Sequence, residues 1–348
     1  MTLTKIKSPL CDMLGITYPI IQAGMGPFNT SKLATAVSDA GGIGTVSVKY
    51  LMDPVEATRT IVEHLHYVKD HTNKNFAVNT PIASEKTSPK EVLDNEDAII
   101  KAVLEAKQKD PELKKRLVLY ITSGGDPTRH HKMIKDAGLF HFHLAGSAKH
   151  AKRVEELGLD GVIASGYEMG GHTHLAGKAI HTFVLVPSVV QTVKIPVIAC
   201  GGVCDAETFA AALAMGAAGV QMGTRFITTN ECDFHENYKK YIVDAGEYSD
   251  IVIQSVISPA RCLKSAGAYK AIELQEVKAK GEMTEQEKSQ ILEELLRRAE
   301  EEGDTENALV AAGQASSRIN SIQTVKEVIE SMVDGAGKII KELQQKIA

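Results

Sequence analysis

The sequence contains no tryptophan, and tyrosine and phenylalanine are scarce, so aromatic residues make up only 5% of the chain. This composition fits an aliphatic core and argues against a surface that stacks on carbohydrate or nucleic-acid bases. Basic residues are not in excess either, because 39 Lys and Arg stand against 44 Asp and Glu, a formal net charge of −5. Without a broad positive field, neither nucleic acid nor an anionic membrane is expected as a partner.

Long hydrophobic runs are also missing, since no stretch reaches the roughly 18 consecutive apolar residues of a membrane-spanning helix. The first residues, MTLTKIKSPLCDMLG, have neither an apolar centre nor a small-residue cleavage site, so we expect no secretory signal. The five cysteines are odd in number and scattered, which is typical of a reducing compartment. We therefore expect a cytoplasmic protein that binds no membrane.

What the sequence does contain is a regular alternation of short apolar runs with amphipathic stretches. The apolar runs predict eight strands: Ile20–Ala23, Ile43–Val48, Phe76–Asn79, Leu117–Thr122, Leu139–Leu144, Gly161–Ser165, Val197–Cys200 and Gly219–Met222. The stretches between them predict helices: Ser31–Ala40, Asp53–His71, Pro89–Lys109, Pro127–Ala137, Ser147–Leu157, Thr182–Val193 and Ala206–Met215. Strict alternation predicts a parallel sheet, and eight repeats favour a closed (β/α)8 TIM barrel over an open doubly wound sheet.

The length of the chain predicts a barrel core with an added C-terminal segment. A β/α barrel takes about 250 residues, so residues 1–232 are assigned to the barrel core. Residues 233–348 are assigned to a helical segment that packs on the barrel and includes a charged arm, 273–302. In that arm Thr284 and Glu287 form a capping-box pattern that opens a helix ending at Gly303. Its narrow apolar strip makes a homodimer one possible arrangement.

Two glycine-rich turns follow the last two predicted strands, Gly201-Gly202 after one and Gly223-Thr224 after the other. Glycine lets main-chain N–H groups approach an anion closely, and the turns after strands 7 and 8 of a β/α barrel commonly bind phosphate. A third loop, residues 166–174, brings His172 to the same barrel mouth. A phosphorylated cofactor beside an imidazole is therefore predicted. Gly41-Gly-Ile-Gly44 lacks the spacing of a dinucleotide-binding turn.

The other histidines predict no site. His141 and His143 alternate along the fifth strand, where one could reach the barrel interior, although structural histidines are the more common case. The helical pairs His130-His131 and His64/His66 are interpreted as solvated. No His-Glu-x-x-His or Cys-x-x-Cys spacing is present, so no metal site is predicted.

A set of motifs carries a family resemblance: Ile20-Ile-Gln-Ala-Gly-Met-Gly26, Ala40-Gly-Gly-Ile-Gly44, Asn75-Phe-Ala-Val-Asn79, Gly166-Tyr-Glu-Met-Gly-Gly-His172, Pro196-Val-Ile-Ala-Cys-Gly-Gly202 and Gly223-Thr-Arg-Phe226. In this order the set resembles the FMN-dependent nitronate monooxygenases, once called 2-nitropropane dioxygenases. The flavin enoyl-ACP reductases and NADH:quinone reductases of the same superfamily are similar across nearly the whole chain, including Ala312-Gly-Gln-Ala-Ser316.

The resemblance implies an FMN across the barrel mouth and a catalytic His172 beside it. The cofactor-binding residues that it implies are Ala23, Gly24, Met25, Asn79, Ser123, Gly124, Ser165, Gly170, Gly171, Gly201, Gly202, Gly223 and Thr224. The implied reaction is the oxidation of an alkyl nitronate, a small-molecule substrate, by O2 to a carbonyl compound and nitrite. The family usually has Pro where this chain has Gly24, and Gly where it has His174, and both positions border the substrate pocket.

Three alternatives stay open at this point. One is an NAD(P)H-dependent flavin reductase that acts on enoyl-ACP thioesters or quinones. Another is a phosphosugar isomerase or aldolase of the same fold, but the predicted strands offer neither a Schiff-base lysine nor paired carboxylates at their ends. The third is a flavin-binding protein without turnover.

Overall fold

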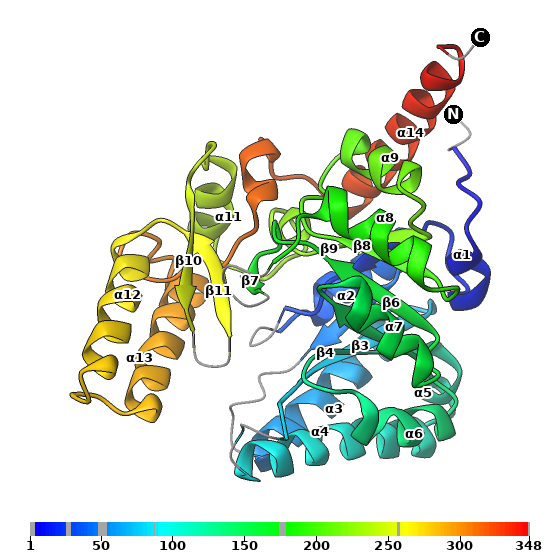
Figure 1. Cartoon of the computed structure of the whole chain (residues 1–348). Coiled ribbons are helices and arrows are strands. Elements are labelled where there is room, and N and C mark those ends of the chain that lie inside the picture. The colour runs from blue at the N-terminus through cyan, green and yellow to red at the C-terminus, as the bar shows by residue number, and fades with distance from the viewer. Residues whose placement is uncertain are drawn as a thin grey trace.

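In the computed structural model, eight parallel strands form one sheet in the order β1-β9-β8-β6-β5-β4-β3-β2. The structure describes residues 4–25, 29–47, 54–85, 88, 90–173, 179–255 and 258–346. The sheet closes between its first and last strands, where the N–H of Gln22 donates to the carbonyl of Ile43 (3.0 Å) and that of Ile43 donates to Ile20 (2.9 Å). The predicted β/α barrel is therefore confirmed (Figure 1).

The barrel strands follow the predicted apolar runs closely: β1 (Ile20–Gln22), β2 (Gly44–Ser47), β3 (Phe76–Ile82), β4 (Leu117–Gly124), β5 (Phe140–Ala145), β6 (Gly161–Ser165), β8 (Val197–Cys200) and β9 (Gly219–Met222). Helices connect them: α2 (Ser31–Asp39), α3 (Pro54–His71), α4 (Lys90–Lys109), α5 (Pro111–Arg116), α6 (Thr128–Asp136), α7 (Ala148–Glu156), α8 (Thr182–Thr192) and α9 (Ala206–Ala214). Within the described residues, no helix is long and apolar enough to cross a membrane.

Side chains of alternating strand residues separate an inner core from an outer one. Ile21, Ile43 and Phe142 belong to the inner cluster, which also holds Leu10 and Leu14 of a short helix, α1 (Pro9–Leu14). Since α1 packs on the N-terminal ends of the strands, it closes the end of the barrel opposite the mouth. The outer faces of the strands pack against the surrounding helices, as expected for parallel strands buried on both faces.

Glycines end several helices and allow close packing of another. Four glycines that follow helices have left-handed φ values, between 72° and 94°: Gly41, Gly138, Gly158 and Gly216. At Gly44 glycine is required for packing, because an added Cβ there would overlap the main chain of Ala34 in α2. The Gly41-Gly-Ile-Gly44 motif therefore serves close packing of α2 on β2 and lies at the N-terminal end of that strand.

A second, three-stranded sheet lies beside the barrel mouth, and the sequence did not predict it. Its strands are β10 (Asp250–Gln254), β11 (Pro259–Leu263) and β7 (Gly171–His172), paired antiparallel in that order. Two helices, α12 (Ala266–Ala279) and α13 (Glu285–Arg297), pack on it at the left of Figure 1. The segment after the barrel is thus not purely helical, because it supplies the hairpin β10–β11 as well.

The charged arm is a helical hairpin with its own core. Thr284 and Glu287 form the predicted capping box of α13, and Gly303 ends the π-helical turn Arg298–Glu302 with φ 72°. Leu292 and Leu295, from the predicted apolar strip, are buried against α12 and β10 and not against the barrel. Because residues of the same chain cover this apolar strip of α13, the strip does not support a homodimer, which stays a prediction.

The remaining elements return the chain to the barrel. They are α10 (Thr224–Ile227), α11 (Glu236–Val243), the 3-10 turn Gln314–Arg318 and the final helix α14 (Val325–Gln344). Helix α14 packs against α9 and α2, as the apolar period around residues 322–332 predicts, and its far end extends away from the barrel (Figure 1).

Candidate cofactor site at the barrel mouth

The predicted cofactor residues lie at the C-terminal ends of barrel strands or in the loop after β6. Because parallel strands end at the same edge, these positions share the mouth of the barrel. Gly223 faces β1, where an added Cβ would lie 3.6 Å from Cβ of Ala23 and 3.9 Å from Sδ of Met25. Gly24 lies directly against the carboxamide of Asn79. The structure therefore brings the residues that follow β1 together with Gly223 after β9 and with Asn79 within β3.

Ser123 and Gly124 lie across the mouth from the glycine turns. They end β4, which is opposite β9 in the strand order. Gly124 packs against β3, because a Cβ added to Gly124 would lie 2.6 Å from the carbonyl oxygen of Ile82. Ser165, at the end of β6, is fully buried and donates to Sδ of Met169 (3.0 Å). These positions border the mouth without touching the glycine turns.

The glycine turn after β8 has two consecutive left-handed residues, with φ of 96° at Gly201 and 79° at Gly202. Side chains other than glycine are strained there. The N–H groups of Gly202, Gly223 and Thr224 have no acceptor among the residues that the structure describes. Unsatisfied main-chain donors at adjoining turns form an anion-binding concavity. The turns thus fit a terminal phosphate.

A second anion-binding position nearby is already filled by the protein itself. The carboxylate of Glu168 accepts hydrogen bonds from the N–H and the hydroxyl of Thr182 (3.0 and 2.8 Å) at the start of α8. His181, on the same turn, lies 3.1 Å from that carboxylate. Because Glu168 occupies the N-terminus of α8, the donors of the glycine turns are the ones that remain for a ligand.

Thr224 has a partner that the motif alone did not reveal. Its hydroxyl oxygen accepts a hydrogen bond from the N–H of Gly313 (2.9 Å), so the hydroxyl proton remains for an anion. Gly313 also packs against Gly170. A Cβ added to Gly170 would lie 2.4 Å from the nitrogen of Gly313, which is closer than real atoms approach. The resemblance included residues 312–316, but it assigned them no role. They join the histidine loop to the turn after β9.

Gln221 is a polar residue of the mouth that the sequence analysis missed. It is paired in register with Ile21 of β1 and Cys200 of β8, both of which belong to the inner cluster. Its side chain therefore points into the barrel, where it is only 3% exposed. The signal available in the sequence was its place two residues before Gly223 on a buried strand.

His172 lies on β7, whereas the sequence predicted a loop at this position. The strand pairs with β11 so that His172 is opposite Ala260. The preceding Gly171 has φ 65°, and a Cβ added there would meet no described atom within 4 Å. The imidazole is reached by solvent, yet the surrounding protein lowers the pKa of His172 below its ordinary value by desolvation. At neutral pH it is thus a neutral base. His174 lies outside the described residues.

The other histidines have structural roles. His141 and His143 point away from the barrel interior, and both rings hydrogen-bond to the hydroxyl of Thr122 (2.9 and 2.8 Å). Burial lowers the pKa of His141 to about 2 and that of His143 to about 3. The expectation that His130 is solvated was wrong, because its side chain is buried between α4 and α6.

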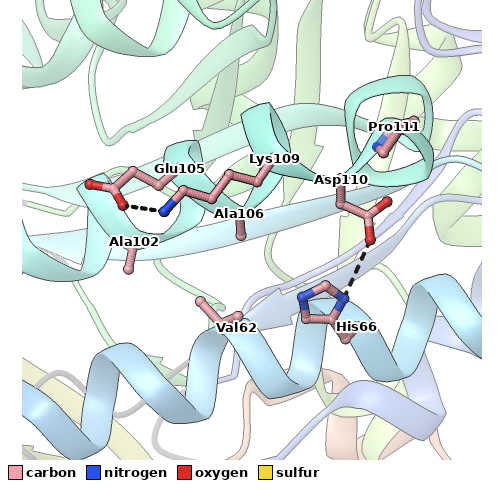
Figure 2. A pocket seen from close by; sticks show the side chains of 8 residues that line it. All are labelled: Val62, His66, Ala102, Glu105, Ala106, Lys109, Asp110 and Pro111. Carbon is pink, nitrogen blue, oxygen red and sulfur yellow. Dashed lines mark hydrogen bonds and ion pairs between the residues drawn. The ribbon is translucent and has the colours of Figure 1, made fainter.

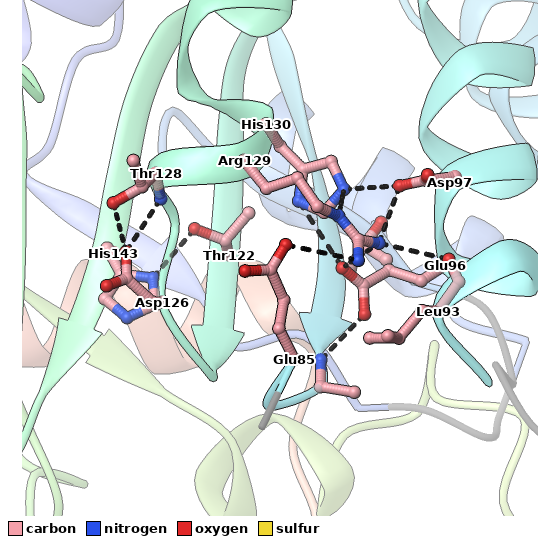
Figure 3. Close-up of polar contacts among 12 residues, drawn as sticks. Glu85, Leu93, Glu96, Asp97, Thr122, Asp126, Thr128, Arg129, His130 and His143 are labelled. Atoms are coloured by element: carbon pink, nitrogen blue, oxygen red, sulfur yellow. Dashed lines mark hydrogen bonds and ion pairs between the residues drawn. The ribbon is translucent and has the colours of Figure 1, made fainter. Parts of the chain in front are cut away.

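A charged cluster at the ends of β3 and β4 places Glu96, Asp97 and His130 within 4.8 Å of one another (Figure 3). The guanidinium of Arg129 already pairs with both carboxylates, 3.3 Å from Glu96 and 2.7 Å from Asp97. Glu96 also accepts the N–H of Ala83 (2.7 Å), directly after β3. Since Arg129 supplies the positive charge, we interpret the cluster as a brace for two loops of the mouth.

Two cavities among the described residues lie away from the mouth. One, of about 490 Å³, is a groove between α3 and α4 on the outside of the barrel (Figure 2). Its charged groups pair with each other, Glu105 with Lys109 (3.0 Å) and His66 with Asp110 (3.6 Å). Asp110 is also the N-cap of α5. The groove is thus accounted for by helix packing and capping.

The fold defines a class: a closed parallel β/α barrel whose last two βα turns present main-chain N–H groups without an acceptor among the described residues. A sequence profile of the family described as nitronate monooxygenase matches residues 7–335. The chain belongs to the nitronate monooxygenase family. A probable nitronate monooxygenase of Staphylococcus aureus (strain MSSA476) is 32% identical over 273 residues, covering 72% of this chain and 76% of that protein.

Solved structures agree with this placement. FabK from Thermotoga maritima superposes with a TM-score of 0.83 at 33% identity, over 98% of this chain and 100% of that chain. A nitroalkane oxidase from Streptomyces ansochromogenes gives a TM-score of 0.76 at 22% identity, over 96% of this chain and 99% of that chain. At that identity the second match shows the shared fold alone.

Proposed function

We propose that this protein is an FMN-dependent nitronate monooxygenase that oxidises alkyl nitronates with O2 to a carbonyl compound and nitrite. The observation that supports it most is the set of main-chain donors on Gly202, Gly223 and Thr224, which have no acceptor among the described residues and lie on the rim that carries His172. Membership of the nitronate monooxygenase family supports the choice of reaction.

The residues of the mouth fit FMN better than a dinucleotide. FMN has one terminal phosphate, which the turns after β8 and β9 would hold, whereas a dinucleotide brings a pyrophosphate and usually a Gly-x-Gly-x-x-Gly turn. Gly24 and Asn79 would border the ring system, and the carboxamide of Gln221 would supply a donor or an acceptor from the barrel interior. When bound, FMN supplies an electron acceptor for the substrate and a reaction partner for O2.

His172 would handle the proton and orient the substrate. Because its pKa is lowered, the neutral ring can remove the α-proton of a neutral nitroalkane at physiological pH. A nitronate has already lost that proton, so for this substrate the ring N–H would donate a hydrogen bond to a nitro oxygen. Loss of His172 should therefore affect the two substrates unequally.

The alternative is an NAD(P)H-dependent flavin reductase of enoyl-ACP thioesters or quinones. The sequence resemblance to such reductases supports it, and the superfamily's reductases bind nicotinamide without a dinucleotide turn. A side-by-side assay of the purified protein separates the two. Nitrite release from a nitronate in air, without turnover of NAD(P)H with a quinone or an enoyl thioester, is the expected result. The reverse pattern would overturn the proposal. The cytoplasmic location and the homodimer remain predictions.

A further inference from the structure

Arg261 of β11 is the largest fully buried side chain in the described part of the protein, and its contacts go to the histidine loop. Its Nε donates to the carbonyl of Met169 (3.1 Å) and its Nη2 donates to the carbonyl of Tyr167 (2.8 Å). The guanidinium also lies over the ring of Tyr167, 4.4 Å from its centroid. One side chain thus fixes two carbonyls and one ring of the loop that leads to His172.

The same strand holds the end of that loop by main-chain pairing. In register, Arg261 is opposite Gly171 and Ala260 is opposite His172, and the N–H of Thr173 donates to the carbonyl of Pro259 (2.7 Å). Gly170 and Gly171 give the loop wide conformational freedom. Without these contacts from β11, the chain itself would not specify where the imidazole sits.

Asp250 balances the buried charge and extends the connection. Its carboxylate pairs with Nη1 of Arg261 and accepts a hydrogen bond from the side chain of Gln314 (3.3 Å). The N–H of Gln314 donates to the carbonyl of Glu168 in the histidine loop (3.0 Å), and the neighbouring Gly313 binds Thr224. The contacts run without a break from β10 to the turn after β9.

We propose that Arg261 is a positioning residue, which fixes the main chain of residues 167–172 and thereby the place of the His172 imidazole at the mouth. The inference rests on the proposed function of His172. Arg261 is buried and acts through carbonyl groups, so it touches neither substrate nor cofactor. The guanidinium reaches these groups with three separate nitrogens in one plane, whereas lysine would have to serve them all from a single nitrogen.

The chain offers a matched control in Arg116. This arginine is also buried, donates to the carbonyls of Thr72 and Lys69 and pairs with Glu112, but it lies at the end of α3 away from the mouth. Arg261→Lys and Arg116→Lys therefore remove the same kind of contact at two places. If both cost a similar amount of stability in urea unfolding, any further difference between them comes from the histidine loop.

Three readouts distinguish positioning from a general loss of stability. In Arg261→Lys we expect faster hydrogen exchange at residues 171–173 and an upward shift of the His172 pKa, followed by NMR on histidine-labelled protein. We also expect kcat on a neutral nitroalkane to fall on the order of 100-fold, the size that a displacement of about 1 Å causes, while the Kd for FMN stays close to that of the wild type. Arg116→Lys should show none of these changes.

The inference is overturned if either exchange or kcat in Arg261→Lys equals that of Arg116→Lys. If Arg261→Lys fails to fold, Asp250→Asn, which weakens the hold on the guanidinium, must show smaller changes in the same directions, and wild-type values there would overturn it. His172→Ala is measured in parallel. Full turnover of His172→Ala would contradict the proposed function. In that case, hydrogen exchange and the His172 pKa in Arg261→Lys would still test the positioning role of Arg261, because neither measurement depends on activity.

Discussion

Gly24 and Asn79 lie in direct contact at the barrel mouth, with so little space that a Cβ on Gly24 would overlap the Asn79 carboxamide. The amide of Asn79 donates to the carbonyl of Ile121 (3.1 Å), so the side chain cannot simply turn away. This contact leaves no room for a side chain at Gly24. It also fixes the ends of β1 and β3 relative to each other.

We predict that Gly24→Ala displaces Asn79 and weakens FMN binding, with a cost of about 1–3 kcal/mol, as is usual for overpacking. The measurement is a fluorescence titration with FMN together with urea unfolding. Gly246→Ala is the control, since an added Cβ there meets nothing within 4 Å. Equal FMN affinity in the two variants would show that the Gly24–Asn79 contact does not border the cofactor.

Gly202→Ala should lower the affinity for FMN more than it lowers stability. A left-handed alanine costs roughly 1–2 kcal/mol wherever it stands, and at Gly202 the turn that presents the phosphate donors must also shift. Gly138→Ala has the same strain, with φ 72° and no atom within 4 Å of the added Cβ, but it caps a helix away from the mouth. Wild-type FMN affinity in both variants would contradict a role of the Gly202 turn in binding the phosphate.

His172→Ala should bind FMN normally and lose turnover. On neutral nitroalkanes the loss should be about 10²–10⁴-fold, the usual contribution of one general base. On the pre-ionised nitronate it should be smaller, because no proton has to be removed. Steady-state rates with both forms of one substrate measure the difference, and equal losses would exclude a role of His172 as the base.

The protein should lose stability in mild acid because of two buried histidines. His141 and His143 have pKa values lowered to about 2 and about 3 by burial, so the folded protein leaves both neutral. Below the ordinary pKa of about 6.5 the unfolded chain binds protons that the folded one does not, so the free energy of unfolding falls as pH decreases. At about pH 5 each histidine should remove about 2 kcal/mol.

Urea unfolding of His143→Gln at about pH 7.5 and pH 5 tests this linkage. The variant loses its bond to Thr122, so the quantity to compare is the change in unfolding free energy between the two pH values and not its absolute size. That change should be smaller than in the wild type, whereas the exposed His71→Gln should match the wild type. An unchanged difference in His143→Gln would assign the acid lability to other groups.

The barrel could be predicted from the sequence because its signals are local. Apolar runs such as Val197–Cys200 form strands at the predicted bounds, and glycines such as Gly138 end helices by their own φ preference. The hairpin β10–β11 was missed because β10 is half exposed and because the pairing of β11 with β7 joins positions far apart in the sequence. The strand that carries His172 was therefore not foreseen.

In the candidate site, too, local features could be predicted and long-range contacts could not. Glycine turns and the histidine carry local patterns, whereas Gln221, Gly313 and Arg261 gain their roles only from contacts across the fold. The burial of His130 was missed for a related reason, since its hydrogen bonds with Asp97 and Arg129 allow a ring on a polar helix to be buried. Contacts of this kind have no signature in spacing or composition.

Anaerobic mixing of the FMN-loaded protein with each electron donor tests the central claim most directly. We expect an alkyl nitronate to bleach the visible flavin absorbance rapidly, with nitrite appearing once air is admitted. NADH and NADPH should leave the absorbance unchanged over the same time. Rapid bleaching by NAD(P)H, with none by the nitronate, would contradict the account and establish the protein as a flavin reductase.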